Sequence, residues 1–203
     1  MTFNDFASSL WLPVLMVLLL GVLAAMWWLY ERLNPLRSIK TLAEMKSWVL
    51  HIAAGKGQRH PAYTLKGWAG DDEWRLEASA GTQTKGVREV AGCTQWQISV
   101  PGPAFVLQPA GEMMPDMQEM AQTGLGGYVA HAQHPDHAQP LLEALQGPLA
   151  DWNAKHGSDR ALLVRVSQSG IELRLPYYEK DIKHVQRLVA MGLTLARVLR
   201  QEE

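Results

Sequence analysis

Two segments rich in methionine and histidine carry the side chains best suited to bind a metal ion. The candidate ligands recur at intervals of three residues and are Met114, Met117, Met120, His131, His134 and His137. Thioether sulfur binds Cu(I), and imidazole nitrogen suits copper, zinc and nickel. Both segments lie within residues 89–154, which hold seven carboxylates and no Lys or Arg, so the local charge favours a cation.

Proline weakens this metal-site interpretation. Pro115 and Pro135 interrupt the helical register that would bring side chains three residues apart onto one face. Pro135 followed by Asp136 is also typical of the start of a helix. The sequence therefore favours a loop with core methionines and no metal or cofactor, and a copper- or zinc-binding protein that uses residues 113–137 is the alternative.

Catalytic signatures are missing from the rest of the sequence. There is no G-x-S-x-G motif, and Gly124-Leu125-Gly126-Gly127 is not followed by the lysine of a phosphate-binding loop. Cys93 directly precedes an alternating strand pattern, which is typical of a small buried residue. The remaining histidines have no spacing that implies a general base: His51, His60, His156 and His184. We therefore predict that the protein is not an enzyme.

The overall composition argues against nucleic acid as a partner and excludes internal disulfide bonds and a zinc site built from cysteines. The 203 residues balance 19 Lys and Arg against 20 Asp and Glu, which gives a formal net charge of −1. Proteins that bind nucleic acid usually have a basic surface, so nucleic acid is not expected as a partner. A single cysteine excludes an internal disulfide framework and a thiolate zinc site.

The amino-terminal part is apolar and uncharged. No charged residue lies between Asp5 and Glu31, and tryptophans stand near both ends of the run. About 20 apolar residues suffice to cross a bilayer core of ~30 Å. This pattern predicts a transmembrane helix over residues 10–30, after a short tail over residues 1–9, with the lipid bilayer as a partner.

The charge on either side of this helix predicts its orientation. Residues 31–60 carry six Lys and Arg against two Glu, whereas the tail has no basic residue. The positive-inside rule then places the amino terminus outside the plasma (inner) membrane and the rest in the cytoplasm. Apolar residues at helical spacing from Leu36 to Ile52, followed by a glycine-rich linker, predict a basic juxtamembrane helix and linker over residues 31–60.

Residues 61–203 have the patterns of a small mixed domain. Alternation predicts a hairpin over residues 63–78, two strands near residues 96–107, and a second hairpin that turns at residues 167–170. Helical spacing predicts helices over residues 140–155, with a kink or break at Gly147-Pro148, and over residues 181–200, with Asp181 as the cap. The predicted fold is α+β: one transmembrane helix, then a cytoplasmic domain with an antiparallel sheet and packed helices.

The predicted function follows from an anchor and a compact domain without a catalytic motif. We expect a single-pass, membrane-anchored accessory protein whose cytoplasmic domain docks a protein partner or associates with itself. The candidate surfaces are the acidic stretch over residues 89–154 and the carboxy-terminal helix.

Overall fold

The computed structural model describes residues 13–27, 36–53, 61–81, 92–110, 116–120, 127–156 and 162–201. The chain divides into two compact units, Met1–Arg37 and Ser38–Glu203, which are considered one at a time.

The first unit contains a helix over residues 13–27 whose side chains are all exposed. At 1.5 Å per residue the described part of this helix spans about 22 Å, against ~30 Å for a bilayer core. Among the described residues, no helix is both long and apolar enough to cross a membrane. This finding contradicts the predicted transmembrane helix over residues 10–30. The single-pass membrane localisation and the first element of the predicted fold class are therefore wrong as well.

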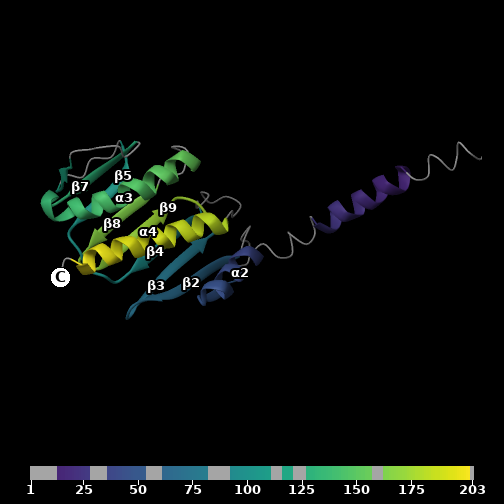
Figure 1. Cartoon of the computed structure of the whole chain (residues 1–203), viewed down its shortest axis with the longest axis horizontal. Helices are drawn as coiled ribbons and strands as arrows, with labels where there is room; N and C mark the ends of the chain where they lie inside the picture. Colours follow the sequence, from purple (N-terminus) through teal and green to yellow (C-terminus); the bar gives the residue numbers. More distant parts are fainter. Residues whose placement is uncertain are drawn as a thin grey trace, which may run out of the picture. The chain divides into compact units, whose positions relative to one another are not determined.

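The second unit is built on a nine-stranded antiparallel sheet with the order β1-β2-β3-β4-β9-β8-β5-β7-β6 (Figure 1). Its elements are α2 (Arg37–Lys46), β1 (Val49–Ala53), β2 (Ala62–Ala69), β3 (Asp72–Ser79), β4 (Cys93–Ile98), β5 (Phe105–Pro109), β6 (Gln118–Glu119), β7 (Tyr128–Ala132), α3 (Pro135–His156), β8 (Leu163–Ser167), β9 (Gly170–Leu175) and α4 (Ile182–Gln201). Helix α4 packs on β4 and β9, and α3 packs on α4 and β7.

One face of the sheet forms the core beneath these helices. Successive cross-strand partners on β2, β3, β4, β9 and β8 are all fully buried on this face: Leu65, Leu76, Trp96, Leu173 and Val164. Neighbouring residues along a strand point to opposite faces. The apolar positions of the strands therefore all meet α3 and α4 on the same side.

The opposite face is polar over the same five strands. Its matching row of cross-strand partners is Lys66, Arg75, Gln97, Glu172 and Arg165. All five side chains are exposed or half-buried. We call this surface of β2, β3, β4, β9 and β8 the open face.

The strands predicted from alternation are present, but one predicted helix is partly wrong. Helix α2 ends at Lys46, Ser47 has a positive φ of 56°, and the chain continues as β1. Val49 and Ile52 satisfy helical spacing, yet their branched side chains suit a strand equally well, and the pairing of β1 with β2 decides between the two. The predicted linker that follows β1 lies outside the described residues.

Helix α3 is continuous through the predicted break. It runs from Pro135 to His156 with Pro148 inside it. A proline in a helix removes one hydrogen bond and costs about 3 kcal/mol. Leu141, Leu145, Leu149 and Trp152 are fully buried along the same helix. At roughly 1.5–3 kcal/mol for each buried side chain, their packing outweighs the cost of the proline.

Helix α4 approaches the sheet closely at one glycine. A Cβ atom placed on Gly192 would overlap the six-membered ring of the Trp96 indole. Trp96 is itself fully buried, so the ring has no room to move away. The distance between α4 and β4 is therefore set by the absence of a side chain at this position.

We predict that Gly192→Ala lowers the free energy of unfolding by about 1–3 kcal/mol, because it overpacks a dense core. Gly147→Ala in α3 is the matched control, since a Cβ there meets nothing within 4 Å apart from its neighbours in the chain. It should change the free energy of unfolding by less than about 1 kcal/mol, because the gain in helix propensity is opposed by contact of the new Cβ with the following Pro148. Urea denaturation of both variants measures the difference, and equal effects of the two substitutions would contradict this account of Gly192.

Candidate functional site

Two of the three methionines proposed as metal ligands, Met117 and Met120, belong to the described residues. Met114 lies outside the described residues. Met117 is half-buried just before β6, and Met120 is buried just after it, where its backbone N–H donates to the Ala130 carbonyl at 2.9 Å. Met120 therefore fills the core, as its sequence context predicted.

The three histidines fall on different elements. His131 lies in β7, whereas His134 and His137 are exposed at the start of α3, with ring centres 5.7 Å apart. The sequence H-x-x-H-x-x-H thus spans a strand, a turn and a helix. In the part of the chain that the structure describes, no three His, Cys, Asp or Glu side chains come close enough to hold a metal ion.

His131 has an unusual environment for a polar side chain. It is only 6% exposed, and neither ring nitrogen has a hydrogen-bond partner among the described residues. Its cross-strand neighbours are Val106 on β5 and Glu119 on β6. A buried polar group without a partner costs about 1–3 kcal/mol. His131 therefore destabilises the fold.

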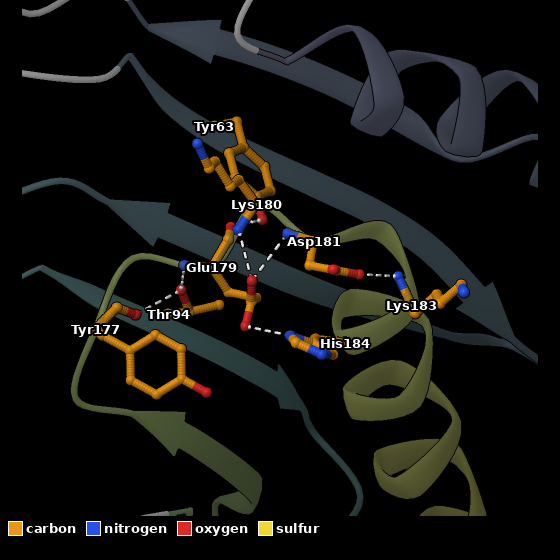
Figure 2. Close-up of polar contacts among 8 residues, drawn as sticks. All are labelled: Tyr63, Thr94, Tyr177, Glu179, Lys180, Asp181, Lys183 and His184. Carbon is orange, nitrogen blue, oxygen red and sulfur yellow. Dashed lines mark hydrogen bonds and ion pairs between the residues drawn. The ribbon is translucent and has the colours of Figure 1, made fainter. Parts of the chain in front are cut away.

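A second polar cluster joins β2 and β4 to the start of α4, and Figure 2 shows its contacts. Its centre is Glu179, which is 4% exposed. One carboxylate oxygen accepts the backbone N–H groups of Lys180 at 2.9 Å and Asp181 at 2.8 Å. The other oxygen lies 2.9 Å from Nδ1 of His184. The buried carboxylate is thus held by polar groups from one short stretch of chain.

Thr94 and Tyr63 bind the backbone of the same connection. The Thr94 hydroxyl donates to the Tyr177 carbonyl at 2.9 Å and accepts the backbone N–H of Glu179 at 2.8 Å. The Tyr63 hydroxyl donates to the Glu179 carbonyl at 2.6 Å. These contacts fix the segment between β9 and α4 on two strands that are distant in sequence.

Burial and hydrogen bonding shift the pKa values of three groups here. Burial, with smaller contributions from Tyr178 and Glu179, raises the pKa of Tyr63 well above its usual value. Burial also raises the pKa of Tyr178 to about 12. Partial burial opposes ionisation of Asp181, but the Lys183 backbone N–H and the neighbouring His184 outweigh it and lower the pKa of that carboxyl. Asp181 accepts the Lys183 N–H at 2.8 Å, which confirms its predicted role as helix cap.

A carboxylate that orients a histidine is also the arrangement of a general base. Here, however, both Glu179 oxygens bind groups at the start of α4, and the hollow on the sheet is lined by other residues. The cluster therefore positions the helix. Sequence reasoning missed Tyr63, Thr94 and Glu179 because their partners are 83 to 116 residues away in the chain.

The open face contains a hollow of about 760 Å³. It is lined by residues of β3, β4, β8 and β9, including Ser99, Ser167 and Ser169. Arg165 and Glu172 are direct cross-strand partners within it, yet neither makes an ion pair or hydrogen bond with any residue that the structure describes. Their charges are therefore available to a ligand.

Other charges near the hollow are already paired. Lys66 contacts Glu73 at 2.7 Å, and Arg75 pairs with Glu77 on the same strand. The two unpaired charges thus stand beside two ion pairs on one rigid surface, which offers a partner one cation and one anion at fixed positions.

Of the two surfaces that the sequence suggested for docking, the structure buries one and exposes part of the other. The apolar stripe of α4 is buried in the core, from Val185 to Leu199. Three carboxylates of the acidic stretch are exposed on α3: Asp136, Glu143 and Asp151.

Comparison with solved structures finds one similar protein. The crystal structure of the mycobacterial trehalose monomycolate transport factor A, TtfA, aligns with a TM-score of 0.48 at 12% sequence identity, over 82% of this chain and 95% of that chain. No protein-family model matches the chain, and no curated protein matches it. What this chain binds must therefore be inferred from its own residues and their geometry.

We predict that His131→Leu raises the free energy of unfolding by about 1–2 kcal/mol, because it removes a buried polar group that has no partner. His134→Leu is the control, since His134 is exposed and its replacement should change stability by less than about 0.5 kcal/mol. Urea denaturation at pH 7 measures both. A His131→Leu protein less stable than wild type would show that the imidazole contributes a favourable contact.

We predict that stability falls as the pH rises above 10. The folded protein holds the Tyr63 proton more tightly than the unfolded chain, whose value is near 10.0, so this stability is complete below pH 10 and is lost above it. Tyr63→Phe should cost about 1 kcal/mol at pH 7, through loss of the hydrogen bond, and should flatten the decline above pH 10. Unfolding free energies measured from pH 7 to 11 provide the test, and an unchanged alkaline slope would exclude Tyr63 as its source.

Proposed function

We propose that this protein is a non-enzymatic accessory protein whose sheet-bearing unit docks a protein partner on the open face. The observation that carries this proposal is that Arg165 and Glu172, side by side in a hollow of about 760 Å³, pair with no residue that the structure describes. An exposed charge that neighbours an opposite charge usually gains a little by pairing with it. These two remain available for contacts with another molecule.

The nature of the hollow supports a partner protein. Its lining combines both signs of charge with the hydroxyl groups of Ser167 at the end of β8, Ser169 in the turn before β9 and Ser99 just after β4. Polar surfaces of this kind give specificity through complementary charge and hydrogen bonds. A segment that carries an acidic and a basic residue a few ångströms apart would match Arg165 and Glu172.

The rest of the unit supports a non-enzymatic role. The buried carboxylate of Glu179 is committed to the backbone and to His184 at the start of α4. The candidate ligands His131, His134 and His137 lie on different elements. Glu179 therefore has a structural role, and the open face is the surface that we propose for binding.

We predict that charge reversal in the hollow weakens partner binding at least about five-fold, since it removes one attraction and adds one repulsion. The variants are Arg165→Glu and Glu172→Lys in the full chain. Arg174→Glu is the matched control, because Arg174 is exposed on the same strand and face as Glu172 but lies outside the hollow. In-cell crosslinking with mass spectrometry measures the yield of each cross-linked partner.

The proposal requires the hollow variants to lose the same partners that Arg174→Glu retains, with thermal stability equal to wild type in all three. Undiminished cross-linking in both hollow variants would overturn it. An equal loss in Arg174→Glu would also overturn it, because the effect would then follow net charge and not the hollow.

A further inference from the structure

The two edges of the sheet differ in how they are protected from other strands. At one edge β6 has only two residues and ends in Glu119. At the other edge β1 has five residues, Val49–Ala53, with no charge and no proline. Short, charged or proline-containing strands are the usual means of preventing edge-to-edge pairing. The β1 edge has none of these means.

The β1 edge is also open. Every residue of β1 except Leu50 is exposed, and the outer residues Val49 and Ile52 are 50% and 51% exposed. Among the described residues, β1 pairs with β2 alone. Its second side therefore has no strand partner in the part of the chain that the structure describes, and its backbone N–H and C=O groups lie beside apolar side chains.

We propose that β1 pairs antiparallel with β1 of a second copy of this chain, about a two-fold axis at His51. The inference concerns a different surface from the open face, and it stands independently of the proposed function. It joins two nine-stranded sheets into one continuous sheet.

The register follows from the two faces of the sheet. Leu50 and Ile52 are cross-strand partners of the buried Leu65 and Tyr63, whereas His51 is the partner of Thr64 on the open face. Residues opposite each other in paired strands share a face, so the two-fold axis must pass through a residue and not between two. An axis at His51 is the choice that pairs all five residues of each strand.

This register matches the side chains well. It places Leu50 opposite Ile52 of the second copy on the core side, and Val49 opposite Ala53 on the open side. Apolar residues therefore meet apolar residues at every position except the central His51. Such cross-strand pairs are the unit that stabilises a sheet.

Charge favours a second copy over a strand from another protein. A strand that pairs with itself places like charges close together, so any lysine or glutamate near the axis would oppose the contact. Residues 47–55 contain no Lys, Arg, Asp or Glu. The strand is therefore compatible with its own copy, and it has no charge with which to select a different partner.

The test uses cysteine crosslinking of the full chain in a Cys93→Ala background, because Cys93 is the natural thiol. His51→Cys should form a disulfide-linked dimer on mild oxidation, since directly opposite Cβ atoms lie about 4.5–5.5 Å apart. Val49→Cys and Ala53→Cys alone should crosslink at least about five-fold less. Each of those cysteines would lie roughly 13 Å from its own copy along the strand. The double variant Val49→Cys/Ala53→Cys should crosslink as well as His51→Cys.

A second variant separates β1 pairing from other self-association, including any through the exposed helix over residues 13–27. Ile52→Lys, added to His51→Cys, should reduce the yield of the dimer at least about five-fold, because the lysines of the two copies would lie close together across the two-fold axis and repel each other. Trp68→Lys is the control, since Trp68 is 67% exposed on β2, one strand from the edge. Equal crosslinking at His51, Val49 and Ala53, or none at His51, would overturn the proposal. The His51→Cys dimer should also form in the Arg165→Glu and Glu172→Lys variants, because the β1 edge and the open face are different surfaces.

Discussion

The contact between α4 and the buried face of the sheet is the interaction on which the rest of the unit depends. Gly192 allows the helix to lie against Trp96 at the middle of the contact. At the start of the helix, Asp181 accepts the Lys183 N–H, and Glu179 accepts the N–H groups of the two residues just before the helix. Near its end Arg200 donates to the Ala69 carbonyl at 2.6 Å and pairs with Asp72. The helix is thus fixed in the middle and at both ends, which orients β4 and β9 beneath it.

This one-sided cover decides which surfaces remain for other molecules. Helices α3 and α4 lie on the same face of the sheet (Figure 1). The alternate residues of β3, β4, β8 and β9 therefore point to the opposite side. Charged and polar side chains there need no partner within the fold, and Arg165 and Glu172 have none among the described residues. Among the described residues the sheet ends at β1, which pairs with β2 alone, so this edge also has no strand partner there.

Much of the sheet could be predicted from local patterns, since alternation along a strand directly reports its two faces. The hairpins at residues 63–78 and 167–170 and the cap at Asp181 were found this way. The pattern was ambiguous at Val49 and Ile52, because these apolar residues fit the spacing of a helix as well as that of a strand. The transmembrane prediction relied on the length of the uncharged apolar run, and among the described residues no helix is both long and apolar enough to cross a membrane.

The sequence by itself determined which side chains are apolar, where strands alternate, and that no catalytic motif or disulfide framework is present. Only the tertiary structure decided that Thr94 and Tyr63 would hold Glu179, that His131 would be buried without a partner among the described residues, and that Arg165 would stand beside Glu172. The physical reason is distance along the chain. Periodicity reports the environment of one element, whereas a site forms from elements whose pairing depends on the free energy of the whole sheet.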